Sequence, residues 1–263
     1  MNANTFINNF NSCSFMDLQK LREQAIIDVR EKLKAAVTDD WLAIQASTGL
    51  DELDKAINLL VKRLREWYEL YNPEFSHATE DHFRFVSLIL TRNKADLLKE
   101  IKVKDTMGAD LPKDDLDAIF NLAKHIKSLF ELSKEQELYL ESMMKKVAPN
   151  IAATAGVLIG AKLMALAGSL ARLSKFPAST IQILGAENAL FRHLKNRSNN
   201  PPKFGILHEH ALVSKVKYGN KGKMARALGD KISIAAKVDY FKGKFVGNML
   251  AEELDKRCRE LSK

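Results

Sequence analysis

The sequence predicts an all-α protein in which a long antiparallel helical coiled coil precedes a compact helical domain. Its 263 residues include 12 glycines and 6 prolines, so few positions interrupt a helix. Apolar residues recur at spacings of three and four over most of the chain, as they do on one face of a helix. The hydrophobic fraction of 46% suffices for one or two cores, and we divide the chain into residues 1–47, 48–146 and 147–263.

Residues 1–47 form a lead-in segment. Helical spacing follows an Asn-rich opening and runs over residues 17–47, and we expect a turn at Ser47–Gly49. The opening lacks the basic start and the apolar run of a signal peptide, so an intracellular, cytoplasmic protein is expected. Cys13 and Cys258 lack the paired spacing of a disulfide framework or a zinc site.

Residues 48–146 have the pattern of a coiled coil. Apolar positions after residue 52 alternate by four and three, and the expected seam is Leu53, Ile57, Leu60, Leu64 and Trp67. Pro73 ends this helix, and a second helical stretch covers residues 80–105. A third helix carries Ile119, Ile126 and Phe130 and can return antiparallel. Periodicity alone leaves open whether the coiled coil pairs with a second copy or forms a hairpin without a partner.

Residues 147–263 are expected to form a separate helical domain. Residues 151–173 are apolar and rich in small side chains, but about 10 apolar residues precede Lys162, whereas a membrane span needs about 20. We therefore expect a buried helix pair and no membrane segment. Residues 180–184 are compatible with a strand or a buried turn, and helices are expected after Gly185, from Lys223 and over residues 245–262.

Positive charge is concentrated in the last third of the chain. Residues 1–171 contain 22 Lys and Arg against 25 Asp and Glu, a net charge of about −3. Residues 172–263 contain 19 against 8, a net charge of about +11. This asymmetry is typical of a polyanion-binding module, and a basic surface that only confers solubility is the alternative.

The sequence predicts a non-enzymatic protein without a metal or a cofactor. It contains none of the common phosphate-loop, dinucleotide, nucleophile-elbow or zinc-protease motifs. The densest histidine segment is His208-Glu209-His210, where alternate side chains of an extended strand would point to opposite faces and no third ligand is nearby in sequence.

Two basic groups in the last third are the candidate RNA contacts. In the first, a glycine turn leads into the start of a helix, whose free backbone amides favour a phosphate. The same group contains an aromatic residue directly after a lysine, and a base can stack on that aromatic ring. This group comprises Gly185, Ala186, Glu187, Asn188, Arg192, His193, Lys195, Arg197, Lys203 and Phe204. The second group comprises Lys221, Lys223 and Arg226. Phe204 is also compatible with a core position under a loop.

Several blocks in order resemble the Nop-domain family. The segment Gly185–Leu194 reads GAENALFRHL, similar to the family's G-A-E-K-A-L-F-R signature. The segments 201–205 (PPKFG), 222–228 (GKMARAL) and 235–241 (AAKVDYF) resemble further family blocks, as do 64–68 (LREWY) and 147–150 (VAPN). The resemblance covers residues 17–263.

The resemblance implies a core protein of archaeal box C/D-type small ribonucleoproteins, which guide ribose 2′-O-methylation of ribosomal RNA. In that family the coiled coil joins two copies. The Nop domain recognises kink-turn RNA together with a kink-turn-binding, ribosomal-like protein, and a separate N-terminal domain recruits a fibrillarin-type methyltransferase. A structural dimerisation protein, or a spliceosomal-type Nop protein without methyltransferase recruitment, is the alternative.

The chain departs from the family pattern at three places. About 16 residues precede the first expected helix, so residues 1–47 are expected to hold a remnant of the N-terminal domain, which puts fibrillarin binding in question. Asn188 replaces a lysine, which removes one possible phosphate contact. Phe204 stands where many relatives have histidine or tyrosine, which keeps stacking and loses a hydrogen bond.

Overall fold

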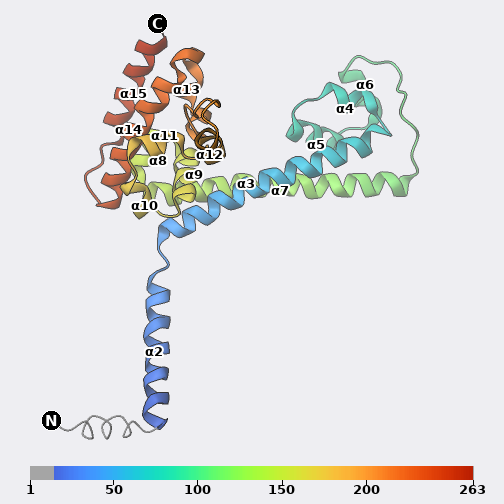
Figure 1. Ribbon diagram of the computed structural model, residues 1–263. Coiled ribbons are helices and arrows are strands. Elements are labelled where there is room, and N and C mark those ends of the chain that lie inside the picture. The colour runs from blue at the N-terminus through green and yellow to red at the C-terminus, as the bar shows by residue number, and fades with distance from the viewer. Residues whose placement is uncertain (1–14, 263) are drawn as a thin grey trace, which may run out of the picture. The chain divides into compact units, whose positions relative to one another are not determined.

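The computed structural model describes residues 15–262, and every regular element in that range is a helix, which confirms the all-α prediction (Figure 1). Cys13 lies outside the described residues. The chain divides into two compact units, Met1–Trp41 and Leu42–Lys263. In the first unit, α2 (Phe15–Ala35) carries exposed apolar side chains such as Leu21 and Leu33. The single helix expected over residues 17–47 is wrong, because α2 ends at Ala35 and α3 begins at Asp39.

Helix α3 (Asp39–Glu69) continues through Ser47–Gly49, so the expected turn there is wrong. The Thr48 hydroxyl donates a hydrogen bond to the carbonyl of Ile44, one turn earlier in the same helix, at 3.0 Å. Ile44 and Leu50 are buried on either side of the segment. The packing of these residues outweighs the turn preference of serine, threonine and glycine.

Helices α3 and α7 (Lys113–Val147) form the predicted antiparallel pair, and Figure 1 shows them running side by side. The middle of the pair is joined by Ser133, whose hydroxyl donates to Asp54 at 3.4 Å. The buried seam is made by Ile57, Val61, Leu64, Tyr68, Ile119, Ala123 and Ile126. On the α3 side the seam therefore includes Tyr68 instead of the expected Trp67, which is 38% exposed.

A small helical cluster caps the far end of this pair. It consists of α4 (Pro73–Ala78), α5 (His82–Thr91) and α6 (Lys94–Glu100). The single helix expected over residues 80–105 is wrong, because extended backbone at Arg92 and Asn93 separates α5 from α6. Tyr68 meets Phe85 edge to face at 5.6 Å between ring centroids, and Phe75 stacks on Phe85 at 5.8 Å. This aromatic contact explains why Tyr68, and not Trp67, faces inward.

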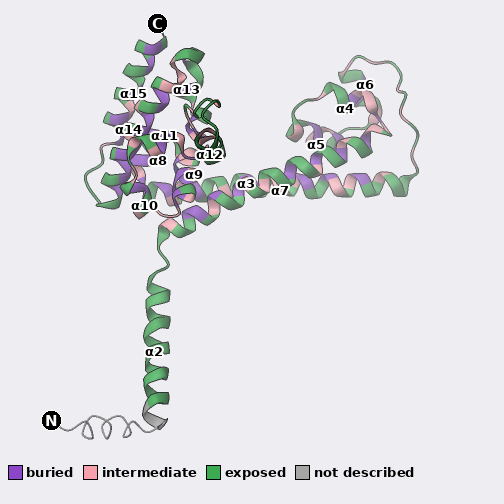
Figure 2. Cartoon of the chain, in the orientation of Figure 1, coloured by how far each residue is buried: buried purple, intermediate pink, exposed green. Residues whose placement is uncertain are grey.

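The C-terminal domain, residues 148–262, is built around α14 (Lys221–Tyr240). Figure 2 shows its buried residues gathered between the helices. Helix α14 contacts α8 (Pro149–Ala155), α10 (Leu170–Lys175), α11 (Ala178–Ile183) and α15 (Gly247–Ser262). Helices α9 (Val157–Ala167), α12 (Glu187–Lys195) and α13 (Ala211–Lys215) complete it, with short 3-10 turns at Ile206–Glu209 and Tyr218–Asn220.

The apolar segment 151–173 divides at two glycines with positive φ. Gly156 has φ of 80° and Gly168 has φ of 86°, a region that glycine adopts without steric cost. Residues 180–184, left open between strand and turn, belong mostly to helix α11. Among the described residues no single helix is long and apolar enough to cross a membrane; α8 and α9 reach that length and composition only together, and they are bent by 116°.

Asp239 holds the C-terminal domain together from within. Its carboxylate accepts hydrogen bonds from the backbone of Asn150 at 3.1 Å and of Ile151 at 2.9 Å, and from the Asn150 side chain at 2.6 Å. The side-chain oxygen Oδ1 of Asn150 in turn accepts from the backbone of Val246 at 2.7 Å. Burial raises the pKa of Asp239 against these hydrogen bonds, which lower it. The network joins the start of α8 to both ends of the α14–α15 connection.

Candidate nucleic-acid interface

The loop that carries Lys203 and Phe204 is laid back along the end of α11. The backbone of Gly205 donates to the carbonyl of Gln182 at 2.8 Å, and that of Ile206 donates to Leu184 at 2.8 Å. A Cβ on Gly205 would lie 1.9 Å from the Leu184 carbonyl oxygen, so only glycine allows this approach. The close fit fixes the position of Lys203.

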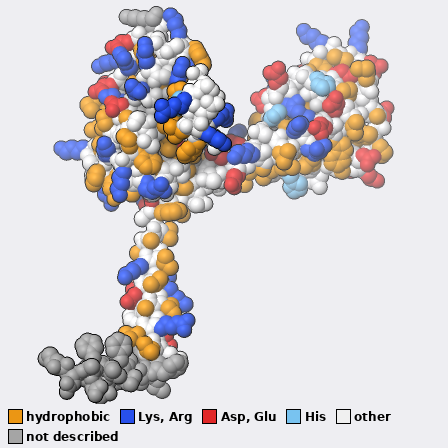
Figure 3. Space-filling model, in the orientation of Figure 1, with side chains coloured by type: hydrophobic (Ala, Val, Ile, Leu, Met, Phe, Trp, Pro, Cys, Tyr) orange, Lys and Arg blue, Asp and Glu red, His pale blue; other side chains and the backbone are white. Residues whose placement is uncertain are grey.

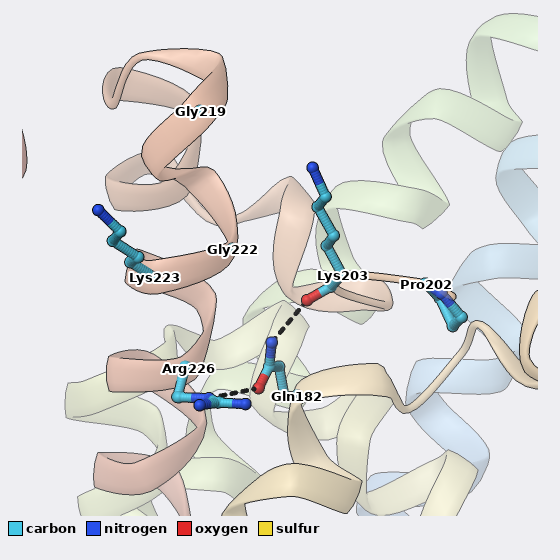
Figure 4. A pocket seen from close by; sticks show the side chains of 7 residues that line it. All are labelled: Gln182, Pro202, Lys203, Gly219, Gly222, Lys223 and Arg226. Atoms are coloured by element: carbon cyan, nitrogen blue, oxygen red, sulfur yellow. Dashed lines mark hydrogen bonds between the residues drawn. The ribbon is translucent and has the colours of Figure 1, made fainter. Parts of the chain in front are cut away.

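Gln182 clamps this loop to α14. Its side chain is 8% exposed, and its amide donates to the Lys203 carbonyl at 2.6 Å. Its carbonyl oxygen accepts from Nε of Arg226 at 3.4 Å. Figure 4 shows the two contacts at the base of a hollow. Gln182 is therefore part of the site although it does not face solvent, and a polar residue inside an apolar run gave no sequence signal for this role.

The hollow above Gln182 has a volume of about 360 Å³ and a basic lining. Figure 4 shows Lys203 and Lys223 rising on two sides of it while Arg226 lies beside Gln182. The complete lining is Gln182, Pro202, Lys203, Gly219, Gly222, Lys223 and Arg226. Three cations from the two sequence groups thus line one hollow. The chemistry fits a phosphate of a nucleic-acid backbone.

Glycine and aromatic residues shape the surroundings of the hollow. Gly222 lies next to the Lys203 side chain, and a Cβ at this position would be in ordinary van der Waals contact with it at 3.6 Å. The Lys203 amine lies 5.9 Å from the ring centroid of Tyr218, which is 79% exposed. An exposed ring next to a cation offers a stacking surface for a base.

A second hollow of about 500 Å³ lies on the other side of the loop. Its lining comprises Leu166, Gly185, Ala186, Phe204, Gly205, Ile206, His208 and Glu209. The rings of Phe204 and His208 are stacked, with 6.3 Å between their centroids and 20° between their planes. Phe204 is half-buried and packs against the core, while part of its ring lines the hollow. It therefore combines the core position and the exposed stacking position that the sequence left open.

Two of the predicted RNA residues have structural partners within the loop. The Glu187 carboxylate accepts from the backbone of Gly185 at 2.8 Å, so this amide is engaged within the chain. Gly185 has φ of 86°, as the turn before α12 requires. The ring of His193 contacts the carbonyl of Asn199. Glu187 and His193 therefore shape the turn and the exit loop.

The remaining predicted residues lie outside the linings of the two hollows. Asn188, Arg192 and Lys195 are exposed on α12, and Arg197 is exposed in the loop after it. Lys221 is half-buried at the first position of α14. Helix α12 also exposes Phe191 at 64% and Leu194 at 62%. Figure 3 shows the visible face of this domain with many Lys and Arg and fewer Asp and Glu.

The predicted coiled-coil residues lie mostly between the two helices of one chain. Ile57, Leu64, Ile119 and Ile126 are buried there, and Leu53, Leu60 and Phe130 are half-buried. A surface for a second copy therefore has to include outward residues of the pair, such as Leu59 at 70% exposure and Leu138 at 67%.

Lys162 connects the lining of the second hollow to helix α3. Its amine forms ion pairs with Asp51 of α3 at 3.0 Å and with Glu209 at 3.5 Å. Burial lowers the pKa of Lys162, but the two carboxylates outweigh this effect and raise the pKa above its ordinary value.

In the described range no three His, Cys, Asp or Glu side chains gather as metal ligands would.

Comparisons with known proteins agree with this architecture. The family model Nop, described as snoRNA binding domain, fibrillarin, matches residues 49–260. An uncharacterized NOP5 family protein of Methanocaldococcus jannaschii is 43% identical over 238 residues, which are 84% of this chain and 57% of that protein. Nucleolar protein 56 of Caenorhabditis elegans is 38% identical over 244 residues, 83% of this chain and 50% of that protein.

A solved structure has the same fold. The crystal structure of a fibrillarin/Nop5p complex matches with a TM-score of 0.55 and 27% identity, and covers 95% of this chain and 81% of the matched chain. The chain spans about half the length of the curated relatives that it matches. The family match covers most of the chain and includes the loop and the helix that build the basic hollow, so this chain belongs to the Nop family.

Proposed function

We propose that this chain is a non-catalytic RNA-binding scaffold of a box C/D-type ribonucleoprotein that guides ribose 2′-O-methylation of ribosomal RNA. One observation carries the proposal: Lys203, Lys223 and Arg226, from two separate segments, converge on one hollow. Gln182 stabilises that hollow, because the nitrogen of its side-chain amide binds the Lys203 carbonyl and the oxygen binds Arg226. The site offers donors for a phosphate and rings for a base.

The Nop domain is proposed to bind a kink-turn RNA jointly with a kink-turn-binding protein. The basic hollow holds the RNA backbone. The exposed apolar side chains of α12, Phe191 and Leu194, suit a protein surface better than a phosphate. RNA alone therefore satisfies part of the site, and RNA already shaped by the partner satisfies all of it.

Titration of a kink-turn RNA tests this proposal. Fluorescence anisotropy would be measured with the RNA alone and with the RNA saturated by a kink-turn-binding protein, at a stated salt concentration. We expect the preformed complex to bind at least about tenfold more tightly, since each 1.4 kcal/mol of added contact is a factor of about ten. Equal affinities would refute joint recognition, and a matched stem without the kink turn is the control RNA.

Self-association through the coiled coil is the second part of the proposal. Exposed apolar residues on the outside of the α3–α7 pair, including Leu59 and Leu138, support it. Light scattering should give a dimer for the chain, and replacement of both leucines by lysine should give a monomer that keeps its helical circular dichroism. A monomer at every concentration would refute this part.

A fibrillarin-type methyltransferase is a further proposed companion. The relative in the solved structure, Nop5p, is in a complex with fibrillarin. A pull-down with purified fibrillarin tests whether this chain shares that interaction. The alternative function, a dimerisation protein whose basic end serves only solubility, would be favoured by a dimer that binds no RNA at low salt.

A further inference from the structure

Figure 1 shows the short connection between α14 and α15. Its sequence contains three aromatic residues and two lysines that the candidate site does not use. Tyr240 is 42% exposed, Phe241 is 76% exposed and Phe245 is 53% exposed. Lys242 and Lys244 lie between them and are also exposed. We name residues 240–245 the aromatic turn.

The aromatic turn is held firmly by the backbone. Phe241 donates to the carbonyl of Lys237 at 3.0 Å, Lys242 donates to Asp239 at 3.2 Å, and Gly243 donates to Val238 at 2.8 Å. The Asp239 and Asn150 network anchors both of its ends. The rings are therefore exposed because the fold places them outside, and not because a loose loop samples solvent.

The end of α6 provides a comparison within the same chain. Lys102 and Lys242 both have positive φ, 58° and 53°, and in both turns the next residue donates to a carbonyl five positions earlier. Lys104 corresponds to Lys244. The α6 turn, however, has half-buried Ile101 where the other turn has exposed Phe241, and Glu100 and Asp105 where it has Tyr240 and Phe245. The rings, and not the lysines or the backbone geometry, distinguish the aromatic turn.

We propose that the aromatic turn is a second contact for single-stranded RNA, in addition to the basic hollow. Bases would stack on Phe241 and Phe245, while Lys242 and Lys244 meet the flanking phosphates; base stacking on aromatic rings beside cations is the usual mode of sequence-tolerant single-strand binding. The carboxylate next to the turn in sequence, Asp239, is buried and accepts hydrogen bonds from Asn150 and Ile151, so it does not face the proposed strand.

The two contacts lie at opposite ends of one rigid helix. Lys223 and Phe241 are 18 positions apart, which is about 27 Å along a helix that rises about 1.5 Å per residue. An RNA that is held at the hollow can reach the aromatic turn with a single-stranded extension. This inference rests on the proposed function, because the hollow supplies the first anchor.

The test compares two RNAs in the presence of a kink-turn-binding protein: a blunt kink-turn hairpin and the same hairpin with a 3′ tail of about 12 uridines, a length within the usual range of single-strand sites. We expect the tail to tighten binding of the full chain about tenfold. Phe241→Ala with Phe245→Ala should remove most of that gain and leave the affinity for the blunt hairpin unchanged.

The lysines are tested with a matched control. Lys242→Gly with Lys244→Ala should lower the tail-dependent salt slope by about 1.4, since each single-strand phosphate contact contributes about 0.7. Glycine also suits the positive φ, so the melting temperature should rise by about 2 °C. Lys102→Gly with Lys104→Ala makes the same chemical change in the α6 turn and should raise the melting temperature similarly without changing RNA binding.

Each outcome separates the two proposals. If the blunt hairpin complex does not bind, the proposed function fails. If it binds but the tail adds nothing, or if the variants keep the full gain, the aromatic turn is not an RNA contact. Sedimentation with vesicles of anionic lipid is the remaining arm, and capture by vesicles that requires Phe241 and Phe245 without any tail effect on RNA would overturn the proposal in favour of a membrane surface.

Discussion

Among the described residues, the fully buried aromatic side chains all lie in the region of α3 to α7, and none lies in the C-terminal domain. Tyr68, Phe75 and Phe85 are at most 1% exposed and hold the helical cluster against the end of α3. Within residues 148–262, none of the seven aromatic side chains belongs to the buried core, which consists of aliphatic residues, methionines and Cys258. The three buried rings stabilise the first region, whereas five of the seven rings of the second region are exposed and available to a ligand.

The largest expected effect is on the stability of the coiled-coil region. Phe85→Ala removes a fully buried ring that contacts Tyr68 and Phe75 and lies 4.3 Å from the Arg65 guanidinium. We expect the free energy of unfolding to fall by about 3–5 kcal/mol, measured by urea denaturation. The control is Phe191→Ala at an exposed position of the other region, which should change stability by less than about 0.5 kcal/mol. Similar losses from both variants would break the comparison.

The next effect concerns the cations of the C-terminal domain. Lys203→Ala with Arg226→Ala should weaken binding of the kink-turn complex by at least about 100-fold, because two charged hydrogen bonds contribute about 1.5–3 kcal/mol each. The salt slope should fall by about 2. Lys55→Ala with Lys62→Ala removes the same charge from exposed positions of α3 and serves as the control. Equal losses in the two double variants would mean that net charge, and not the hollow, determines affinity.

A smaller effect is expected from the buried network of the C-terminal domain. Asp239→Asn keeps the size of the side chain but replaces one acceptor oxygen by a donor facing the amide of Ile151. Unfolding at neutral pH should require about 2 kcal/mol less, since a buried donor loses its partner.

The same variant should alter the pH dependence of stability. The folded-state pKa of Asp239 is raised, so its contribution to stability is complete below its ordinary value of 3.8 and declines as pH rises through the raised pKa. Denaturation curves of the variant should lack this decline, and an unchanged pH profile would contradict the assignment.

The smallest effect is expected where the two regions meet. Lys162→Met keeps the aliphatic stem and removes the ion pairs to Asp51 and Glu209. We expect a loss of about 1 kcal/mol at neutral pH. Because the folded-state pKa of Lys162 is raised, that contribution is complete below 10.5 and is lost as pH rises through the raised value. The difference between the two proteins should therefore shrink in strong alkali, and a constant difference would indicate packing instead.

Local periodicity predicted the helices and part of the seam, because the burial of Ile57 and Leu64 follows from their own spacing. It could not distinguish Trp67 from Tyr68, since that choice depends on rings at positions 75 and 85 that approach only in the folded chain. Ser47–Gly49 was mistaken for a turn for the same reason: its helical state depends on tertiary packing.

The sequence allowed the cations of the site to be predicted, but not how they are arranged in space. Lys203 and Arg226 belong to different sequence groups, and only the folding of the loop along α11 brings both to one hollow. Gln182 was missed because a lone polar residue among apolar ones gives the same pattern whether it is solvated or buried. Glu187 carries the family signature, yet its carboxylate completes a turn inside the chain.

The clamp made by Gln182 has a consequence for how an RNA is received. A neutral amide fixes the orientation of Arg226 without cancelling its charge, whereas a glutamate at this position would hold the guanidinium and neutralise it. The loop carbonyl and the arginine are also ordered before any ligand arrives, so the entropy of fixing them is lost during folding and not during association. The site is thus prepared in shape while its full positive charge remains available to the incoming strand.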